Sequence, residues 1–202
     1  MPNGVLCYHL DEHLFGKCSK GGNVVRNTQL TDMDFDRILR ASSREDRALW
    51  ILAVETGYRI DDLLRVRQYQ ISRATSNDKP FLSLAERKTG KTRVVSLSPR
   101  ALDAIATLWG LVERRHPLAY FFQARRRLPG QKNKLHRVTV YRHFNRILRE
   151  TKLAGKGYTV HSLRKLYALH AYERTGSLLA VQEDLNHTSL NTTMLYVANL
   201  RL

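Results

Sequence analysis

The sequence predicts an α+β domain that is mostly helical and carries one small antiparallel β-hairpin. Apolar residues recur at helical spacing over most of the chain, as in Phe35, Ile38 and Leu39. The pattern changes after Pro80, where PFLSLAE and TRVVSLS flank the turn-forming RKTGK. We expect one principal domain over residues 31–202, preceded by an extension or linker over residues 1–30 that contains GKCSKGGN.

The first two helices have clear start and stop signals. Thr31 is placed as an N-cap with Asp34 in the first turn, so a helix should follow it. A second helix should run from Ser43 through an apolar stretch and stop at Gly57.

The next segment, YRIDDLLRVR, again has apolar residues at helical spacing. This spacing puts Arg59 on the first turn of a third helix, beside the core. The β-hairpin begins at Pro80, and a further strand near Ile71 is an alternative for the segment before it.

The second half of the chain is predicted to be helical. Ser98 followed by a proline starts a helix that should end before Pro117, and a basic loop over 124–137 precedes the next helix. Three further helical stretches are expected over 161–175, 177–185 and about 191–200, the first two closed by Gly176 and Asn186.

The charge balance indicates a polyanionic partner. Lys and Arg outnumber Asp and Glu by 34 to 18, a formal charge of +16, and nucleic acid is the first candidate. The chain has no apolar run of about 18 residues, which argues against a membrane, and its N-terminal stretch lacks the features of a signal peptide, so we expect it in the cytoplasm.

Two cysteines and two histidines near the N-terminus raise the question of a zinc site. Cys7 and Cys18 bracket His9 and His13. Their spacing matches none of the usual zinc patterns, so we expect two reduced thiols and no metal.

Several polar residues have an ordinary structural explanation when each is taken alone. A lysine in a hairpin turn is usually a solvated charge, and a tyrosine in phase with an apolar helix face is usually part of the core. Their order along the chain changes this reading. TGYRIDDLLRVR, a lysine in a β-hairpin, HSLRK and LNHTSLNTTMLY follow one another in a way that resembles the tyrosine recombinase (phage integrase) family over about residues 30–196.

The resemblance implies the tyrosine recombinase catalytic-domain fold and a set of site residues. The arginine of the T-G-x-R motif falls on Arg59, supported by Asp62, and the hairpin lysine falls on Lys88, with Lys91 as the alternative. The H-x-x-R motif, the later histidine and the nucleophile complete the implied set: His161, Arg164, His187 and Tyr196.

These residue types suit phosphodiester chemistry. Two guanidinium groups stabilise the charge that develops on the phosphate, and two histidines add hydrogen bonds and can handle the proton of a phenol whose ordinary pKa is about 10. The lysine donates a proton to the departing 5′-oxygen. The product is a 3′-phosphotyrosyl enzyme, and neither a cofactor nor a divalent metal is required.

The sequence also departs from the family pattern. Asn186 stands where the family usually has glycine before its second histidine, and asparagine tolerates the left-handed conformation well. Residues 1–30 are too few for the helical DNA-clamping domain of most members, which leaves open a short single-domain member or a fragment. The terminal VANLRL is too short to reach a neighbouring protomer, so we expect a monomer in the absence of DNA.

Three functions remain open from the sequence. The first is a site-specific recombinase acting on double-stranded DNA, with self-association on DNA into a tetrameric synapse and accessory DNA-bending proteins as partners. The second is a DNA-binding regulator that does not cut, and the third is nicking and resealing of the type IB topoisomerase kind. Integration, excision, inversion and resolution share one chemistry and are not distinguished.

Overall fold

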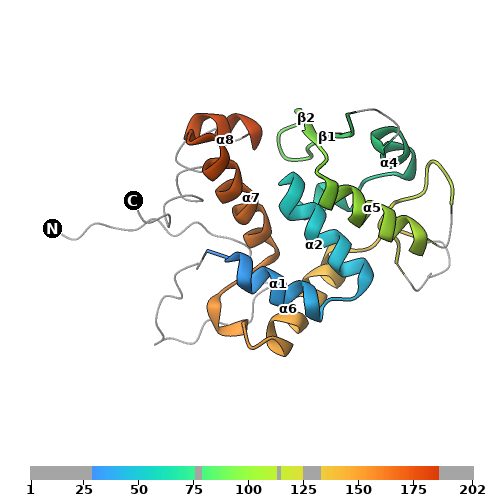
Figure 1. Cartoon of the computed structure of the whole chain (residues 1–202). Coiled ribbons are helices and arrows are strands. Elements are labelled where there is room, and N and C mark those ends of the chain that lie inside the picture. The colour runs from blue at the N-terminus through green and yellow to red at the C-terminus, as the bar shows by residue number, and fades with distance from the viewer. Residues whose placement is uncertain (1–28, 76–78, 113–114, 125–132, 187–202) are drawn as a thin grey trace.

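The computed structural model describes residues 29–75, 79–112, 115–124 and 133–186. Over these residues the domain is largely helical and includes one two-stranded antiparallel sheet (Figure 1). In chain order the elements are α1 (Asp32–Ala41), α2 (Arg44–Thr56), α3 (Ile60–Leu63), α4 (Gln68–Thr75), β1 (Phe81–Ala85), β2 (Thr92–Ser96), α5 (Pro99–Leu111), α6 (Arg137–Glu150), the 3₁₀ helix η1 (Ala154–Lys156), α7 (Val160–Thr175) and α8 (Leu178–Asp184).

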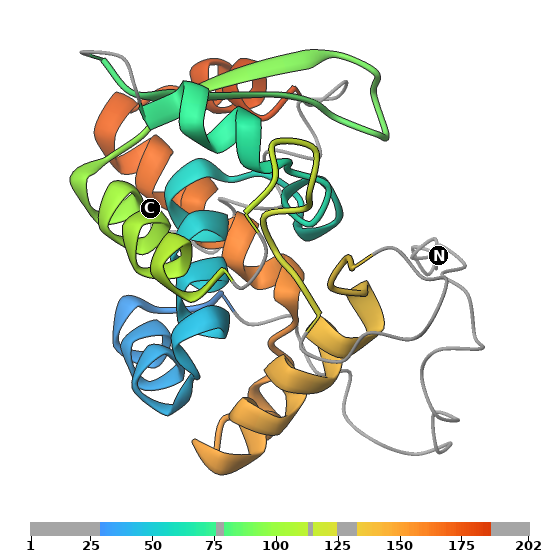
Figure 2. The same cartoon turned by 90° about the vertical axis from the view of Figure 1, so that its right-hand side faces the viewer.

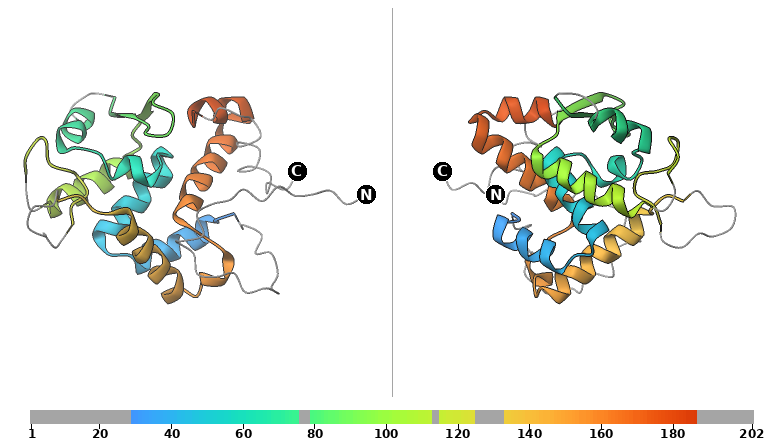
Figure 3. Two further views of the ribbon diagram at one scale, coloured as in Figure 1. Left: turned by 180° about the vertical axis from the view of Figure 1, so that it is seen from behind. Right: turned by 45° about the vertical axis from the view of Figure 1, so that its right-hand side comes forward.

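Helix α2 forms the centre of the molecule. It packs against α5 on one side and α7 on the other (Figure 3). Most of its side chains are buried because it has neighbours on more than one face. Trp50 is fully buried and meets Phe144 of α6 edge-on, with ring centroids 5.1 Å apart.

The hairpin of β1 and β2 lies at the end of the molecule where α8 also lies (Figure 2). Its register pairs Phe81 with Ser96 and Ala85 with Thr92. Alternate side chains of both strands point into the core, and α4 packs beside β1. The hairpin therefore has one buried face and one open face.

The predicted helix ends are confirmed at several caps. The side chain of Thr31 accepts a hydrogen bond from the N–H of Asp34, and that of Ser43 accepts from Asp46. Gly57 and Gly176 close α2 and α7 with positive φ angles of 62° and 64°. These local signals therefore set the helix lengths that later position the site.

Two predictions about the segment from Arg59 to Thr75 need correction. The suggested strand near Ile71 is wrong, because this residue lies in α4, where Ile71 and Ala74 share a buried helical face. Arg59 is the N-cap of the short helix α3 rather than a member of its first turn. The predicted helix over about 191–200 and residues 1–28 lie outside the described residues, so the division of the chain at residue 30 stays a prediction.

Within the described part of the chain, no helix is long and apolar enough to cross a membrane. No group of three or more His, Cys, Asp or Glu side chains that could hold a metal ion occurs among the same residues. The cysteines and histidines considered for zinc, Cys7, His9, His13 and Cys18, lie outside them.

Candidate active site

A buried carboxylate joins two of the predicted site residues. Glu86 follows β1, and its side chain is fully buried. Its Oε2 lies 2.7 Å from Nη1 of Arg59, and its Oε1 lies 3.4 Å from Nη1 of Arg164. The two guanidinium groups thus meet on one carboxylate, as a pair of cations would at a phosphate.

Arg164 is held deep in the domain. Its side chain is 2% exposed, and it donates from Nη1 to the carbonyl of Gly57 at 2.6 Å and from Nη2 to the carbonyl of Leu185 at 2.8 Å. These acceptors end α2 and α8, while Arg164 itself belongs to α7. Its position therefore depends on the packing of three helices.

Gly57 explains why the T-G-x-R motif needs its glycine. The residue has φ +62°, and an added Cβ would lie 2.3 Å from the Tyr167 ring. Only a residue without a side chain allows both the left-handed turn and this close approach. The turn presents the carbonyl of Gly57 to Arg164 and places Arg59 two residues further on.

The hairpin turn that carries Lys88 is attached to the same cluster. The N–H of Arg87 donates to Oδ1 of Asp62 at 3.0 Å, so Asp62 contacts the hairpin turn, and its support of Arg59 stays a prediction. The N–H of Glu86 donates to the carbonyl of Lys91 at 3.0 Å, and the N–H of Gly90 to the carbonyl of Glu86 at 2.8 Å. Both lysines, Lys88 and Lys91, are exposed.

The charges of the cluster shift its carboxylates in opposite directions. Burial alone would raise the pKa of Glu86, but the charges of Arg164 and Arg59 and their hydrogen bonds lower it overall. Burial raises the pKa of Asp62, and the nearby Glu86 carboxylate adds to the increase. Glu86 is therefore the carboxylate that stays ionised most readily.

His161 lies at the start of α7 within the field of the same cations. Desolvation and the positive charges of Arg164, Lys165, Arg59 and Lys88 lower its pKa to about 4, although the residue keeps an exposed surface. The imidazole is thus neutral near pH 7 and can accept or donate a hydrogen bond. The shift also indicates that Lys88 and His161 lie in one neighbourhood.

A second buried arginine connects the hairpin to α8, and this contact was not predicted from the sequence. Arg93 of β2 is 3% exposed at its side chain, and its Nη2 lies 3.3 Å from Oδ1 of Asp184 in α8. Its guanidinium lies 4.8 Å from the ring centroid of Tyr58 and 5.3 Å from that of Tyr167. Tyr167 also donates a hydrogen bond to Asp184. Hairpin, α7 and α8 are therefore joined by polar contacts beside the site.

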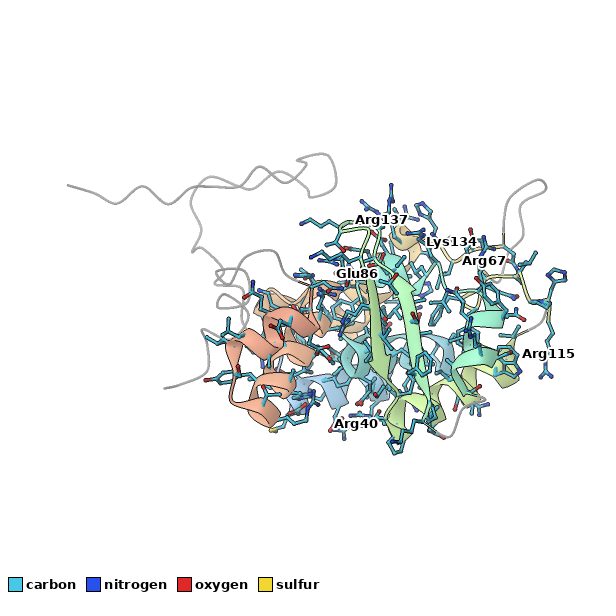
Figure 4. The ribbon with its side chains drawn as sticks, turned by 90° about the horizontal axis from the view of Figure 1, so that it is seen from above. Arg40, Arg67, Glu86, Arg115, Lys134 and Arg137 are labelled. Atoms are coloured by element: carbon cyan, nitrogen blue, oxygen red, sulfur yellow. The ribbon has the colours of Figure 1, made fainter. Side chains whose placement is uncertain are left out.

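Basic side chains lie near the cluster on the surface. In Figure 4, Arg137, Lys134 and Arg67 lie along the upper edge of the view, and the buried Glu86 lies inward from this edge, whereas Arg40 lies at the lower edge. The guanidinium of Arg67 stacks 3.6 Å from the Tyr120 ring centroid, and Lys134 lies 5.8 Å from the same ring. We call Arg67, Lys134 and Arg137 the basic edge.

The structure brings together five of the predicted site residues: Arg59, Asp62, Lys88, His161 and Arg164. The other two, His187 and Tyr196, lie outside the described residues, and their roles stay predictions. Asn186, the last residue before them, has φ +50°. The expected left-handed turn at this position is therefore confirmed.

A helical domain with a lysine-bearing hairpin beside an arginine pair defines the class: the tyrosine recombinase catalytic domain. The chain belongs to the phage integrase family, whose model matches residues 28–201. Relatives at the sequence level agree with this. The tyrosine recombinase XerA of Pyrococcus furiosus is 31% identical over 171 residues, which cover 83% of this chain and 56% of the relative.

A shorter relative is matched over more of its length. The probable integrase/recombinase YoeC of Bacillus subtilis is 28% identical over 157 residues, 77% of this chain and 78% of the relative. The chain spans only about half of the length of the XerA proteins that it matches, 56% in one and 55% in the other.

Solved structures share the fold. The crystal structure of XerA recombinase aligns with a TM-score of 0.66 at 20% identity, covering 83% of this chain and 59% of that one. The lambda integrase catalytic core aligns with a TM-score of 0.61 at 23% identity, covering 79% of this chain and 91% of that one. The second match is nearly complete for a catalytic core alone, so the described fold corresponds to that unit.

Proposed function

We propose that this chain is the catalytic part of a site-specific DNA recombinase that breaks and rejoins strands through a 3′-phosphotyrosyl intermediate. The observation that supports this most directly is the convergence of Arg59 and Arg164 on one carboxylate, at 2.7 and 3.4 Å. Guanidinium groups bind both carboxylates and phosphates through charge-assisted N–H···O hydrogen bonds. A pair with this spacing is suited to a phosphodiester.

The proposed step starts with attack by Tyr196. Its phenolic oxygen forms a bond to phosphorus as the bond to the 5′-oxygen breaks, and its proton passes to a histidine, His161 or His187. A neutral His161 suits this task, because an imidazolium has no free lone pair to accept a proton. Lys88 donates a proton to the departing 5′-oxygen.

The two arginines stabilise the transition state. Negative charge grows on the non-bridging oxygens during attack, and Arg59 and Arg164 offset it in a site partly shielded from water. Asp62 supports the turn that carries Lys88 through the N–H of Arg87. The 5′-hydroxyl of another strand then attacks the phosphotyrosine and reseals the DNA, so neither ATP nor a divalent metal takes part.

The proposed partner is double-stranded DNA. Among the structures that share this fold, XerH is described in a post-cleavage complex with palindromic difH substrate, and lambda integrase as a dimer bound to a COC′ core site. We propose in addition that this chain assembles on DNA as a tetrameric synapse, with accessory DNA-bending proteins, at the nucleoid in the cytoplasm. The formal charge of +16 supports a nucleic-acid partner.

The test is formation of a covalent adduct. A nicked suicide duplex carrying the host site, identified by sequencing DNA crosslinked to the protein in cells, should give a denaturant-resistant adduct with the wild-type chain. Tyr196→Phe should bind the duplex and form none, because it lacks the attacking oxygen. An adduct that persists in Tyr196→Phe would disprove the assignment of the nucleophile.

The alternatives predict other results. Tight binding without any adduct in the wild type would indicate a regulator that does not cut. Adduct formation with relaxation of supercoiled DNA but no exchange between two sites would indicate an activity of the type IB topoisomerase kind.

A further inference from the structure

Glu86 lies between the two arginines but has no place among the residues that the family resemblance assigned. Its carboxylate is fully buried, and its two oxygens face Arg59 and Arg164 separately, at 2.7 and 3.4 Å. A carboxylate buried in this way is costly unless its partners hold it, so both contacts matter for the arrangement.

We infer that Glu86 is a positioning residue that holds the Arg59 and Arg164 guanidinium groups at the separation of one phosphate before DNA binds. The inference rests on the proposed function and adds a residue to its machinery. Glu86 acts through the arginines and not on the substrate.

The two arginines need this help to different degrees. Arg164 is 2% exposed and is held by the carbonyls of Gly57 and Leu185 as well as by Glu86. Arg59 is 23% exposed, and its contact with Glu86 connects it to the buried arginine. A long side chain that is partly open to solvent samples many rotamers unless a partner restrains it. Glu86 therefore orders Arg59 relative to Arg164.

The negative charge of Glu86 also stabilises the arginine pair. Two guanidinium groups that approach one anion repel each other, and a carboxylate between them offsets that repulsion while the phosphate is absent. An amide at this position cannot do the same, because it has one oxygen and one NH₂ group. In Glu86→Gln, one arginine would face an oxygen and the other would face a donor.

The hairpin turn should survive this substitution. Its closing hydrogen bonds use the backbone of Glu86: its N–H donates to the carbonyl of Lys91 at 3.0 Å, and its carbonyl accepts from the N–H of Gly90 at 2.8 Å. The side chain of Thr89 also donates to Oε2 of Glu86 at 3.3 Å, a contact that the amide oxygen can still accept. Glu86→Gln thus isolates the effect on the arginines from the fold of the turn.

The experiment compares Glu86→Gln with a matched control, Glu55→Gln. Glu55 is less buried than Glu86, with 21% of its side chain exposed; it accepts from Ser98 Oγ at 2.6 Å and lies 3.8 Å from Arg100, which is not one of the two site arginines. Single-turnover adduct formation, duplex affinity and thermal unfolding are measured for both. We expect Glu86→Gln to cleave about a hundredfold more slowly, because a misplacement of catalytic groups by about 1 Å has an effect of this size, with duplex affinity nearly unchanged.

A substrate with a sulfur leaving group distinguishes the effect of the arginines on cleavage from the effect of the general acid. Replacing the bridging 5′-oxygen by sulfur removes the need for a proton donor, so it should restore cleavage in Lys88→Ala but not in Glu86→Gln. The inference would be overturned if Glu86→Gln formed the adduct at the wild-type rate, or if its rate fell only as much as that of Glu55→Gln. Full rescue of Glu86→Gln by the sulfur substrate would also overturn it.

A measurement without DNA keeps the inference testable if no adduct forms in the wild type. The ¹⁵Nη signals of Arg59, assigned by their loss in Arg59→Lys, should report slow rotation of the guanidinium in the wild type and in Glu55→Gln. In Glu86→Gln the two Nη signals of Arg59 should merge into one, because the guanidinium then rotates rapidly. Averaged signals in the wild type, or unchanged signals in Glu86→Gln, would overturn the positioning role whatever the outcome of the cleavage assay.

Discussion

His161 is surrounded by cations, and its titration provides a test at the scale of one side chain. Because its pKa is lowered to about 4 in the folded protein, from 6.5, the ring should stay neutral well below pH 6. NMR titration of the imidazole should therefore show a midpoint near pH 4, with His161→Gln used to assign the signal.

The same shift has a consequence for stability. Between pH 6.5 and about 4 the unfolded chain binds a proton at this histidine more readily than the folded chain does, so the free energy of unfolding should fall as the pH falls through this window. The fall should be smaller in His161→Gln. A midpoint at or above pH 6.5, or identical pH profiles for the two proteins, would contradict the proposed surroundings of this residue.

The motif residues were predictable from sequence, but their buried partner was missed. Arg59, His161 and Arg164 stand in short motifs whose order along the chain is informative. Glu86 carried a weaker signal, because it continues the alternation of Leu82 and Leu84 on the buried face of the hairpin. A carboxylate in phase with core residues needs a cationic partner, and local sequence does not say which one.

At the scale of an element, the glycine that ends α2 should be intolerant of change. Gly57→Ala introduces a Cβ 2.3 Å from the Tyr167 ring at φ +62°. We expect a loss of at least about 1–3 kcal/mol in the free energy of unfolding from overpacking, with backbone strain in addition. Cleavage should fall further, because the carbonyl of Gly57 holds Arg164. Denaturant unfolding and adduct formation measure the two effects.

Gly110 provides the matched control. It lies within α5, and an added Cβ there would meet nothing within 4 Å. Gly110→Ala should stabilise the protein by at most about 0.5 kcal/mol, because Gly110 is the last but one residue of α5 and the preference for alanine is smaller there than in a helix interior. Similar stabilities for the two variants would argue against the tight contact at Gly57.

Helix ends were easier to predict than the identity of one short segment. Caps such as Ser43 and Gly176 act within one turn and are visible in the sequence. Helix α4 is short, and its buried Gln68 accepts a hydrogen bond from the distant N–H of His116. This tertiary contact has no local signature, which is why the alternative of a strand near Ile71 arose.

At the scale of the whole molecule, the basic edge should contribute phosphate contacts. Neutralising Lys134 and Arg137 together, as Lys134→Gln and Arg137→Gln, should reduce the slope of log affinity against log salt by about 0.9 for each lost contact. Arg40→Gln, on the opposite edge in Figure 4, should leave the slope unchanged. Fluorescence anisotropy with a duplex over a range of salt concentrations measures both.

Equal salt slopes for the wild type, the double variant and Arg40→Gln would exclude Lys134 and Arg137 from the DNA interface. The sequence predicted a polyanionic partner from total charge, but total charge does not show where on the surface the cations gather. That distribution depends on how α3, the segment around Tyr120 and α6 come together.

The burial of Arg164 has a consequence for biosynthesis. Its acceptors belong to residues 57, 86 and 185, which are far apart along the chain and include one that follows the arginine itself. During translation, Arg59 and Glu86 leave the ribosome long before Leu185 does. Until α8 has been made and docked, the guanidinium of Arg164 lacks one of the carbonyls that hold it. A nascent chain therefore cannot complete the contacts that hold Arg164 until Leu185 has left the ribosome and α8 has docked.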